Sequence, residues 1–147
     1  MKSIFNDDSF NELLNRVERL NKDSAPKWGK MSVAQMVWHC QGPLNIILEK
    51  NDYGMKPSLL AKLFFKKSLY NDTPWRKGLP TAKFLKTKEY KEFDKEKDVL
   101  VSLMNELYTQ RNKEEWKAHP AFGYFTKDQW GQMQYKHLDH HLRQFGV

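Results

Sequence analysis

Apolar residues recur at intervals of three and four positions in four long stretches of the chain, the spacing of a single buried face on an α-helix. Three of the starts carry a Ser or Thr followed three residues later by Glu or Gln, the pattern of a capping box. These pairs are Ser9 with Glu12, Ser32 with Gln35, and Thr126 with Gln129. Pro43 falls inside the second stretch, where it can bend a helix. The pattern predicts helices at about 9–21, 32–51, 90–111 and 126–144.

The segment between the second and third long helices has a different pattern. Residues 57–69 are predicted to form a short, amphipathic, basic helix, whereas 70–87 contain two prolines and a glycine and are predicted to be irregular. No stretch alternates apolar and polar residues as a strand does. We therefore expect an all-α fold, a four-helix bundle of one domain over residues 1–147, with a long crossing that contains a short extra helix.

The net charge of +7 is concentrated in one part of the chain. Ten Lys or Arg residues lie between Lys56 and Lys91, against only Asp72 and Glu89. This basic segment, residues 56–91, has two interpretations: a solvated surface, or a surface that attracts an anionic substrate, a phosphate backbone or an acidic membrane surface. Nucleic acid is the disfavoured partner, because the aromatic residues are not interleaved with the basic ones in a recognition module.

Cysteine usage and hydropathy indicate the compartment. Cys40 is the single cysteine, so no intramolecular disulfide forms, and we expect it to be a small buried apolar residue. The first residues do not resemble a signal peptide, and no apolar run has the length of a membrane span. These features predict a soluble cytoplasmic protein with no membrane partner.

Three of the five histidines lie within two turns of the last predicted helix. His137 and His141 are four residues apart, so both imidazoles project from one face at a separation that suits a single metal ion. His140 lies at the edge of this face and is a weaker candidate. Asp139 lies on the opposite face, where we expect it to pair with Arg143 rather than to share the ion.

A metal site needs at least one more protein ligand, because two imidazoles bind an ion weakly. His39, on the inward flank of the second predicted helix, can supply it if the two helices are neighbours. The alternative for His39 is a core histidine satisfied by a hydrogen bond. His119 lies in a loop at 117–123, where packing of the loop competes with a role near the site. Four tryptophans are candidates to line a pocket: Trp28, Trp38, Trp75 and Trp130.

Several catalytic motifs are absent from the sequence. Leu138 occupies the position that a zinc-protease His-Glu-x-x-His motif gives to glutamate. The chain also lacks a glycine-rich phosphate loop, a Gly-x-Ser-x-Gly elbow and a Cys-x-x-Cys pair.

Three segments together resemble the DinB/YfiT-like superfamily of metal-binding four-helix bundles. They are Ser-Val-Ala-Gln-Met-Val-Trp-His at 32–39, His-Pro-Ala-Phe-Gly at 119–123, and Tyr-Lys-His-Leu-Asp-His-His-Leu-Arg-Gln-Phe-Gly at 135–146. The resemblance covers nearly the whole chain, and the last segment is similar to one uncharacterised branch. The basic segment is an addition to the minimal bundle of that superfamily.

The resemblance implies a divalent metal, commonly zinc or nickel, held by histidines that match His39, His137 and His141. It also implies open coordination positions for water or substrate, and a homodimer. Better-known members are transferases and isomerases that use a low-molecular-weight thiol, and others are described only as metal-dependent hydrolases.

Two hypotheses for function follow. In the first, the protein is a metal-dependent enzyme, a hydrolase or a thiol-dependent transferase acting on a small molecule, in which Lewis acidity generates the nucleophile. No Asp or Glu can be placed beside the ion from sequence, so no general base is assigned. In the second, the protein is a non-enzymatic stress-response or binding bundle whose basic segment, residues 56–91, binds an anionic partner.

Overall fold

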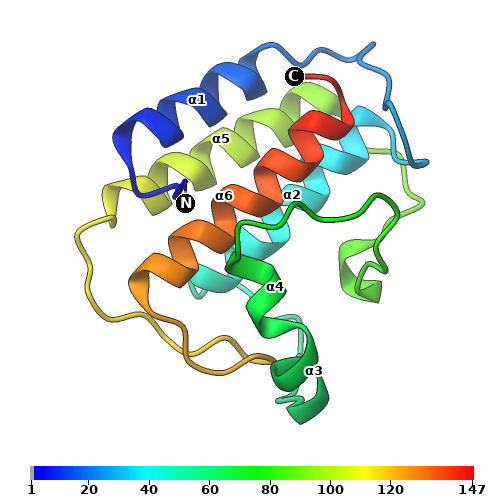
Figure 1. Cartoon of the computed structure of the whole chain (residues 1–147). Helices are drawn as coiled ribbons and strands as arrows, with labels where there is room; N and C mark the ends of the chain where they lie inside the picture. The colour runs from blue at the N-terminus through cyan, green and yellow to red at the C-terminus, as the bar shows by residue number, and fades with distance from the viewer. Residues whose placement is uncertain (1) are drawn as a thin grey trace.

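The computed structural model describes residues 2–147, and this part of the chain is all-helical, with no β-strand beyond an isolated bridge between His119 and Gly123. Figure 1 shows the arrangement. The helices are α1 (Asp7–Glu18), α2 (Val33–Ile47), α3 (Leu59–Phe64), α4 (Lys66–Tyr70), the 3₁₀ helix η1 (Lys83–Leu85), α5 (Phe93–Thr109) and α6 (Lys127–Gln144).

The four longer helices pack around one apolar core. Helix α2 packs against α5 and α6, and α1 packs against the same two helices, so α6 contacts both α1 and α2 (Figure 1). Each helix contributes fully buried side chains to this core, among them Leu13, Val37, Met104 and Leu138. This packing fixes α2 and α6 as neighbours, which the sequence alone left open.

Two of the three predicted helix caps are confirmed. The capping boxes of Ser32 with Gln35 and of Thr126 with Gln129 both form. The predicted box at Ser9 is wrong: α1 begins at Asp7, and Ser9 is a buried residue inside the helix. Two acidic residues in the first turn of α1 favour this earlier start, because carboxylates stabilise the positive end of a helix.

The second helix is shorter than predicted. It continues through Pro43 but ends at Ile47 instead of about residue 51. Glu49 has a φ of 60°, and a residue in this left-handed conformation cannot continue a right-handed helix. Helix α5 likewise begins at Phe93, because the Glu92 carboxylate accepts hydrogen bonds from the next backbone N–H groups and caps the helix there.

The predicted single helix at 57–69 is two helices, since the backbone of Phe65 departs from ideal helical geometry between α3 and α4. Helix α4 packs on α6, whereas α3 projects from the body of the molecule (Figure 1). The following crossing is irregular except for η1, largely as predicted. None of the helices in residues 2–147 combines the length and the apolar character that a membrane crossing requires.

Candidate metal centre

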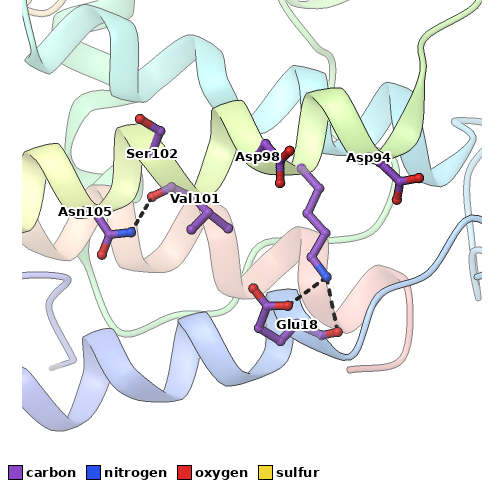
Figure 2. Close-up of a pocket in the computed structure, with 7 residues that line it drawn as sticks. Glu18, Asp94, Asp98, Val101, Ser102 and Asn105 are labelled. Atoms are coloured by element: carbon purple, nitrogen blue, oxygen red, sulfur yellow. Dashed lines mark hydrogen bonds and ion pairs between the residues drawn. The ribbon is translucent and has the colours of Figure 1, made fainter.

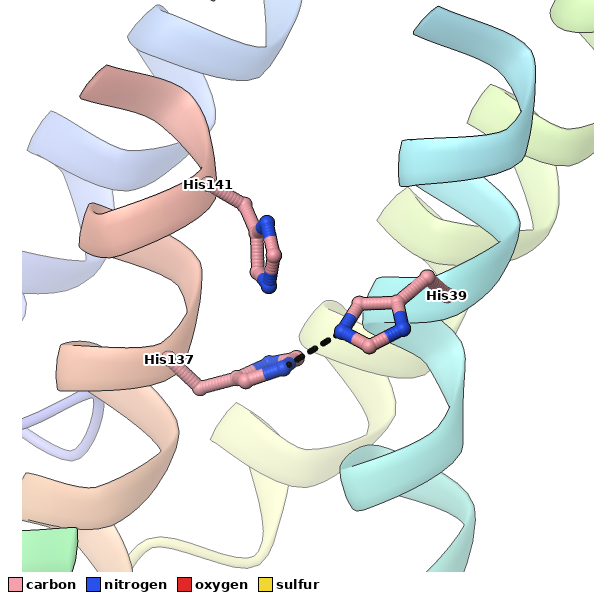
Figure 3. Close-up of side chains that lie close together, drawn as sticks. All are labelled: His39, His137 and His141. Carbon is pink, nitrogen blue, oxygen red and sulfur yellow. Dashed lines mark hydrogen bonds between the residues drawn. The ribbon is translucent and has the colours of Figure 1, made fainter. Parts of the chain in front are cut away.

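The structure brings His39 of α2 together with His137 and His141 of α6 (Figure 3). Each ring offers one nitrogen to a set of three atoms that lie within 4.8 Å of one another, and all three residues are buried. The ring centroids of His137 and His141 are 4.8 Å apart, and that of His39 lies 5.0 Å and 4.5 Å from them. Three imidazoles at this spacing could hold a metal ion.

Hydrogen bonds on the far side of two rings fix which nitrogen faces the centre. The Nδ1–H of His39 donates to the carbonyl oxygen of Leu85 at 2.9 Å, and the Nδ1–H of His141 donates to Oε1 of Gln144 at 2.9 Å. Gln144 is itself held, because its Nε2 donates to the Trp28 carbonyl at 2.8 Å. Both histidines therefore present an Nε2 lone pair to the centre, the arrangement that outer hydrogen bonds impose on metal-binding imidazoles.

His137 completes the set differently. Its Nε2 lies 3.0 Å from the Nε2 of His39, and its Nδ1 is buried with no hydrogen-bond partner among residues 2–147. Because the His39 nitrogen carries a lone pair, the metal-free pair requires a proton on Nε2 of His137. A cation would need a lone pair at that atom, so binding would require the other tautomer of His137, with its proton on Nδ1.

Burial keeps these rings uncharged. Desolvation lowers the pKa of His141 to about 3, and it also lowers the pKa of His39, whose bond to Leu85 partly opposes the shift. The pKa of His137 falls well below its usual value, first through burial and then through the neighbouring imidazoles. Neutral imidazole is the form that binds metals, so the cluster is ready for a cation at neutral pH.

The donor set fits a divalent metal that prefers nitrogen. Nitrogens around a tetrahedral ion with bonds of about 2.0–2.1 Å lie roughly 3.3 Å apart. The His39 and His137 nitrogens are already close to that spacing. Among residues 2–147 the group that could hold an ion contains these three histidines and no carboxylate. Three protein ligands would leave a coordination position for an exogenous molecule, as in catalytic zinc sites.

Two neighbours of these histidines in the sequence have other roles. His140 is buried, and its ring packs 5.1 Å from that of His141, but it does not belong to the cluster. Asp139 pairs with Arg143 at 3.4 Å, as predicted. It also pairs with Arg16 of α1 at 2.8 Å, so it ties α6 to α1 on the side away from the histidines.

His119 and Cys40 are packing residues. The Nδ1 of His119 accepts hydrogen bonds from the backbone N–H groups of residues 121 and 122, and its ring stacks on Trp130 at 5.6 Å. This confirms the loop-packing interpretation. Cys40 is fully buried and burial raises the pKa of its thiol, so it is the small apolar residue that the sequence predicted.

Two of the four candidate tryptophans lie beside the histidines. The Trp75 ring is 5.9 Å from that of His137 and 5.6 Å from that of His140, and Trp28 is 5.9 Å from His140. Trp130 instead packs in the core, and Trp38 lies beneath Lys91. Trp75, on the irregular crossing, therefore borders the site, and Trp28 packs against the neighbouring His140.

Two surface hollows lie outside the cluster. One, of about 370 Å³, lies over α5 and the end of α1, where the Lys97 ammonium bonds to Glu18 (Figure 2). It contains no histidine and lies apart from the three rings. The other, of about 420 Å³, is next to Trp28 and is bordered by Lys27, Lys77 and Arg143.

Sequence reasoning missed Leu85, Gln144 and Arg16. Leu85 acts through a backbone carbonyl, which no side-chain pattern reveals. Gln144 lies three residues after His141 on the same helix, so its neighbouring position was a usable signal. Arg16 is a buried arginine on the first helix, and its partner lies 123 residues away.

Comparisons with known proteins give one match. A family model described as a protein of unknown function, DUF1569, matches residues 4–146. No curated protein matches the chain. No solved structure matches it either.

Proposed function

Since the chain belongs to the DUF1569 family, whose function is unknown, we propose from the geometry alone that it is a metal-dependent enzyme. His39, His137 and His141 hold one divalent ion. The observation that carries the proposal is the convergence of these three buried rings, two of which are oriented by hydrogen bonds on their outer nitrogens. A core histidine that served packing alone would not need two like neighbours, because each buried imidazole costs desolvation.

We further propose that the four longer helices form the bundle of the DinB/YfiT-like superfamily. The packing of α1, α2, α5 and α6 around one core supports this assignment. So does the placement of the ligands, one on the second long helix and two near the carboxyl end of the last. Metal sites in helical bundles are commonly built from side chains on facing helices.

The chain's own residues do three things in this proposal. Leu85 and Gln144 fix the tautomers of His39 and His141, so that both present lone pairs inward. His137 would carry its proton on Nδ1 instead of Nε2, so that its Nε2 offers the third lone pair. Trp75 packs against the His137 ring and would limit the access of water to it.

Zinc or nickel is the proposed ion, because an all-imidazole donor set suits these metals better than magnesium or calcium. When bound, such an ion supplies Lewis acidity, which makes a nucleophile available near neutral pH without a side-chain base. The reaction proposed is hydrolysis of a small molecule or transfer of a low-molecular-weight thiol to it. The absence of a carboxylate from the cluster in residues 2–147 fits a reaction that needs no general base at the ion.

The test is a calorimetric titration of chelator-treated protein, prepared without a histidine tag, with zinc and with nickel. One equivalent should bind, and the His137→Ala/His141→Ala variant should lose more than about a hundredfold in affinity, since even outer partners of metal ligands contribute ten- to hundredfold. The matched control is His140→Ala, which removes the neighbouring imidazole and should retain binding. Stoichiometric binding by the double variant would refute the proposal.

A further inference from the structure

Five large apolar side chains are exposed in seven consecutive residues of the crossing. Leu59, Leu60, Leu63, Phe64 and Phe65, here called the apolar tip, are between 61% and 72% exposed. Elsewhere in residues 2–147, large apolar side chains with comparable exposure are scattered. Single exposed apolar residues are ordinary, but a contiguous group marks a surface that binds something.

The rest of the molecule holds the tip in place. Lys136 of α6 donates hydrogen bonds to the Ser68 and Asn71 carbonyls of α4 and its end, at 2.7 Å and 2.9 Å. The backbone N–H of Ser58 donates to the carbonyl of Ala121, and the Lys66 ammonium bonds to the carbonyl of Tyr124. These hydrogen bonds hold both ends of the tip against the body of the molecule, and α3 projects from it (Figure 1).

The charged residues that flank the tip in the sequence all have one sign. Between Asp52 and Asp72 the chain has no acidic residue and four lysines: Lys56, Lys62, Lys66 and Lys67. Three of these are exposed, and Lys66 is half-buried. An apolar surface with cationic flanks complements a surface that is apolar inside and anionic outside.

We propose that the apolar tip inserts into the interface of an anionic membrane and that the three exposed lysines, Lys56, Lys62 and Lys67, contact its lipid headgroups. An interfacial segment of this kind places its apolar side chains about 5–10 Å into the headgroup and acyl boundary. Each nearby lysine adds attraction to anionic lipid. This mode of binding requires no membrane-spanning helix, and it differs from our sequence expectation that the protein has no membrane partner.

A second copy of the chain suits the tip less well. A six-residue helix spans about 9 Å, whereas a stable dimer buries roughly 800 Å² on each partner over about 20–30 residues. A symmetric contact between two tips would also bring the four lysines of each copy together. A lipid surface has neither problem, because it accepts a single small tip and supplies the opposite charge.

The test is sedimentation of the full chain with vesicles of phosphatidylcholine alone and of an equimolar mixture with phosphatidylglycerol. The protein should bind the mixed vesicles, bind phosphatidylcholine weakly, and dissociate as salt is raised. Leu63→Ser/Phe64→Ser should lose more than about tenfold in affinity. Lys62→Gln/Lys67→Gln should lose roughly twenty-five-fold, at about fivefold per lysine.

Matched control variants remove exposed aromatic and lysine side chains that lie outside the tip. Tyr90→Ser removes an aromatic side chain that is 88% exposed, and Lys22→Gln/Lys95→Gln removes two exposed lysines. Both should bind vesicles as the unaltered protein does. Equal binding by the two tip variants, or no binding by the unaltered protein, would overturn the proposal.

Light scattering measures the mass of the protein without lipid and tests whether a second copy of the chain covers the tip. A dimer that becomes a monomer in Leu63→Ser/Phe64→Ser would show that a second copy covers the tip, and would overturn the lipid assignment. A mass unaffected by this substitution supports it. Zinc affinity should be unchanged in the tip variants, so membrane binding and metal binding are tested independently.

Discussion

The histidine cluster and the apolar tip each reverse the usual distribution of side chains in a folded protein. The cluster buries polar side chains, and the tip exposes apolar ones. At the cluster, polar rings are buried between α2 and α6, and hydrogen bonds fix two of them. At the tip, apolar side chains are exposed on the short helix α3, and none of them is buried in the core. Each arrangement costs stability, which points to a use outside folding. We propose that the cluster binds a small cation and that the tip binds a membrane surface.

The largest expected contrast between the two regions is in stability, from the same substitution at two sites. Leu138→Ala on α6 removes a side chain that is 1% exposed and should cost about 2–5 kcal/mol of the free energy of unfolding. Leu63→Ala on α3 removes one that is 67% exposed and should change it by less than about 0.5 kcal/mol. Urea denaturation of both variants measures the difference.

Similar losses for both leucines would show that Leu63 is covered in solution and contributes to the fold. The tip would then not be a free surface. The two regions would then not differ in how far their leucines are buried.

The orientation of His141 can be tested through its outer partner. Gln144→Leu removes the acceptor of the His141 Nδ1–H and should lower zinc affinity by about ten- to hundredfold. The control is Gln134→Leu on the same helix, which removes a bond to the Pro43 carbonyl and touches no ligand. Competition titration against a chelating dye measures both. Equal affinity losses in the two variants would refute a specific role for Gln144.

Buried neutral imidazoles predict a pH dependence of stability for the metal-free protein. The folded pKa of His141 is about 3, lowered mainly by burial, and that of His119 is about 4, also through burial. In the unfolded chain, histidine titrates near 6.5. Below about pH 6.5 the unfolded state therefore binds more protons, and stability is lost as the pH falls. Each such histidine contributes a slope that approaches about 1.4 kcal/mol per pH unit.

Urea denaturation at a series of pH values from 7.5 to about 4.5 measures this slope, because the range spans the histidine pKa of the unfolded chain. The free energy of unfolding should decrease over this range. A flat profile would mean that the rings are solvated, contrary to their burial in the structure. The apolar tip carries no histidine, so Leu63→Ser/Phe64→Ser should show the same profile as the unaltered protein.

The smallest expected effect concerns the space beside His39. A Cβ added at Gly42 would lie 2.1 Å from the Leu85 side chain, whose carbonyl accepts the His39 hydrogen bond. Gly42→Ala should displace Leu85 and lower zinc affinity severalfold, less than removal of a ligand's partner would. Gly131→Ala on α6 is the control, since a Cβ there would lie 2.1 Å from the Ser3 Oγ and would crowd no group that bonds to a histidine ligand. Both glycine variants can be compared by the same chelator competition, and unchanged affinity in Gly42→Ala would show that Leu85 accommodates the extra carbon.

Much of the all-helical fold follows from the sequence, because helical periodicity and capping boxes act locally. The Ser32 and Thr126 starts are confirmed for this reason. The false start at Ser9 shows the limit, since the same motif can occur inside a helix whose first turn is stabilised by other residues. The break at Phe65 and the end of α2 depend on backbone conformations that periodicity does not encode.

The sequence predicted the three histidines of the site, but it could not predict that α2 and α6 are neighbours or which groups bond to the outer nitrogens of the rings. Spacing on α6 placed His137 and His141 on one face, whereas the approach of His39 depended on which helices are neighbours. The Leu85 carbonyl could not be found from any pattern, because every residue has one. The exposure of the tip was also hidden: the leucines of residues 57–69 form an apolar stripe, and only the fold shows that no other helix covers it.

The central claim is that the Nε2 atoms of His39, His137 and His141 share one ion. X-ray absorption spectroscopy of the zinc-loaded protein tests this most directly, because imidazole ligands give characteristic multiple scattering. We predict three imidazole nitrogens at about 2.0–2.1 Å from zinc, and two in the His39→Ala variant. A spectrum without imidazole scattering, or one that is identical in the variant, would contradict the account.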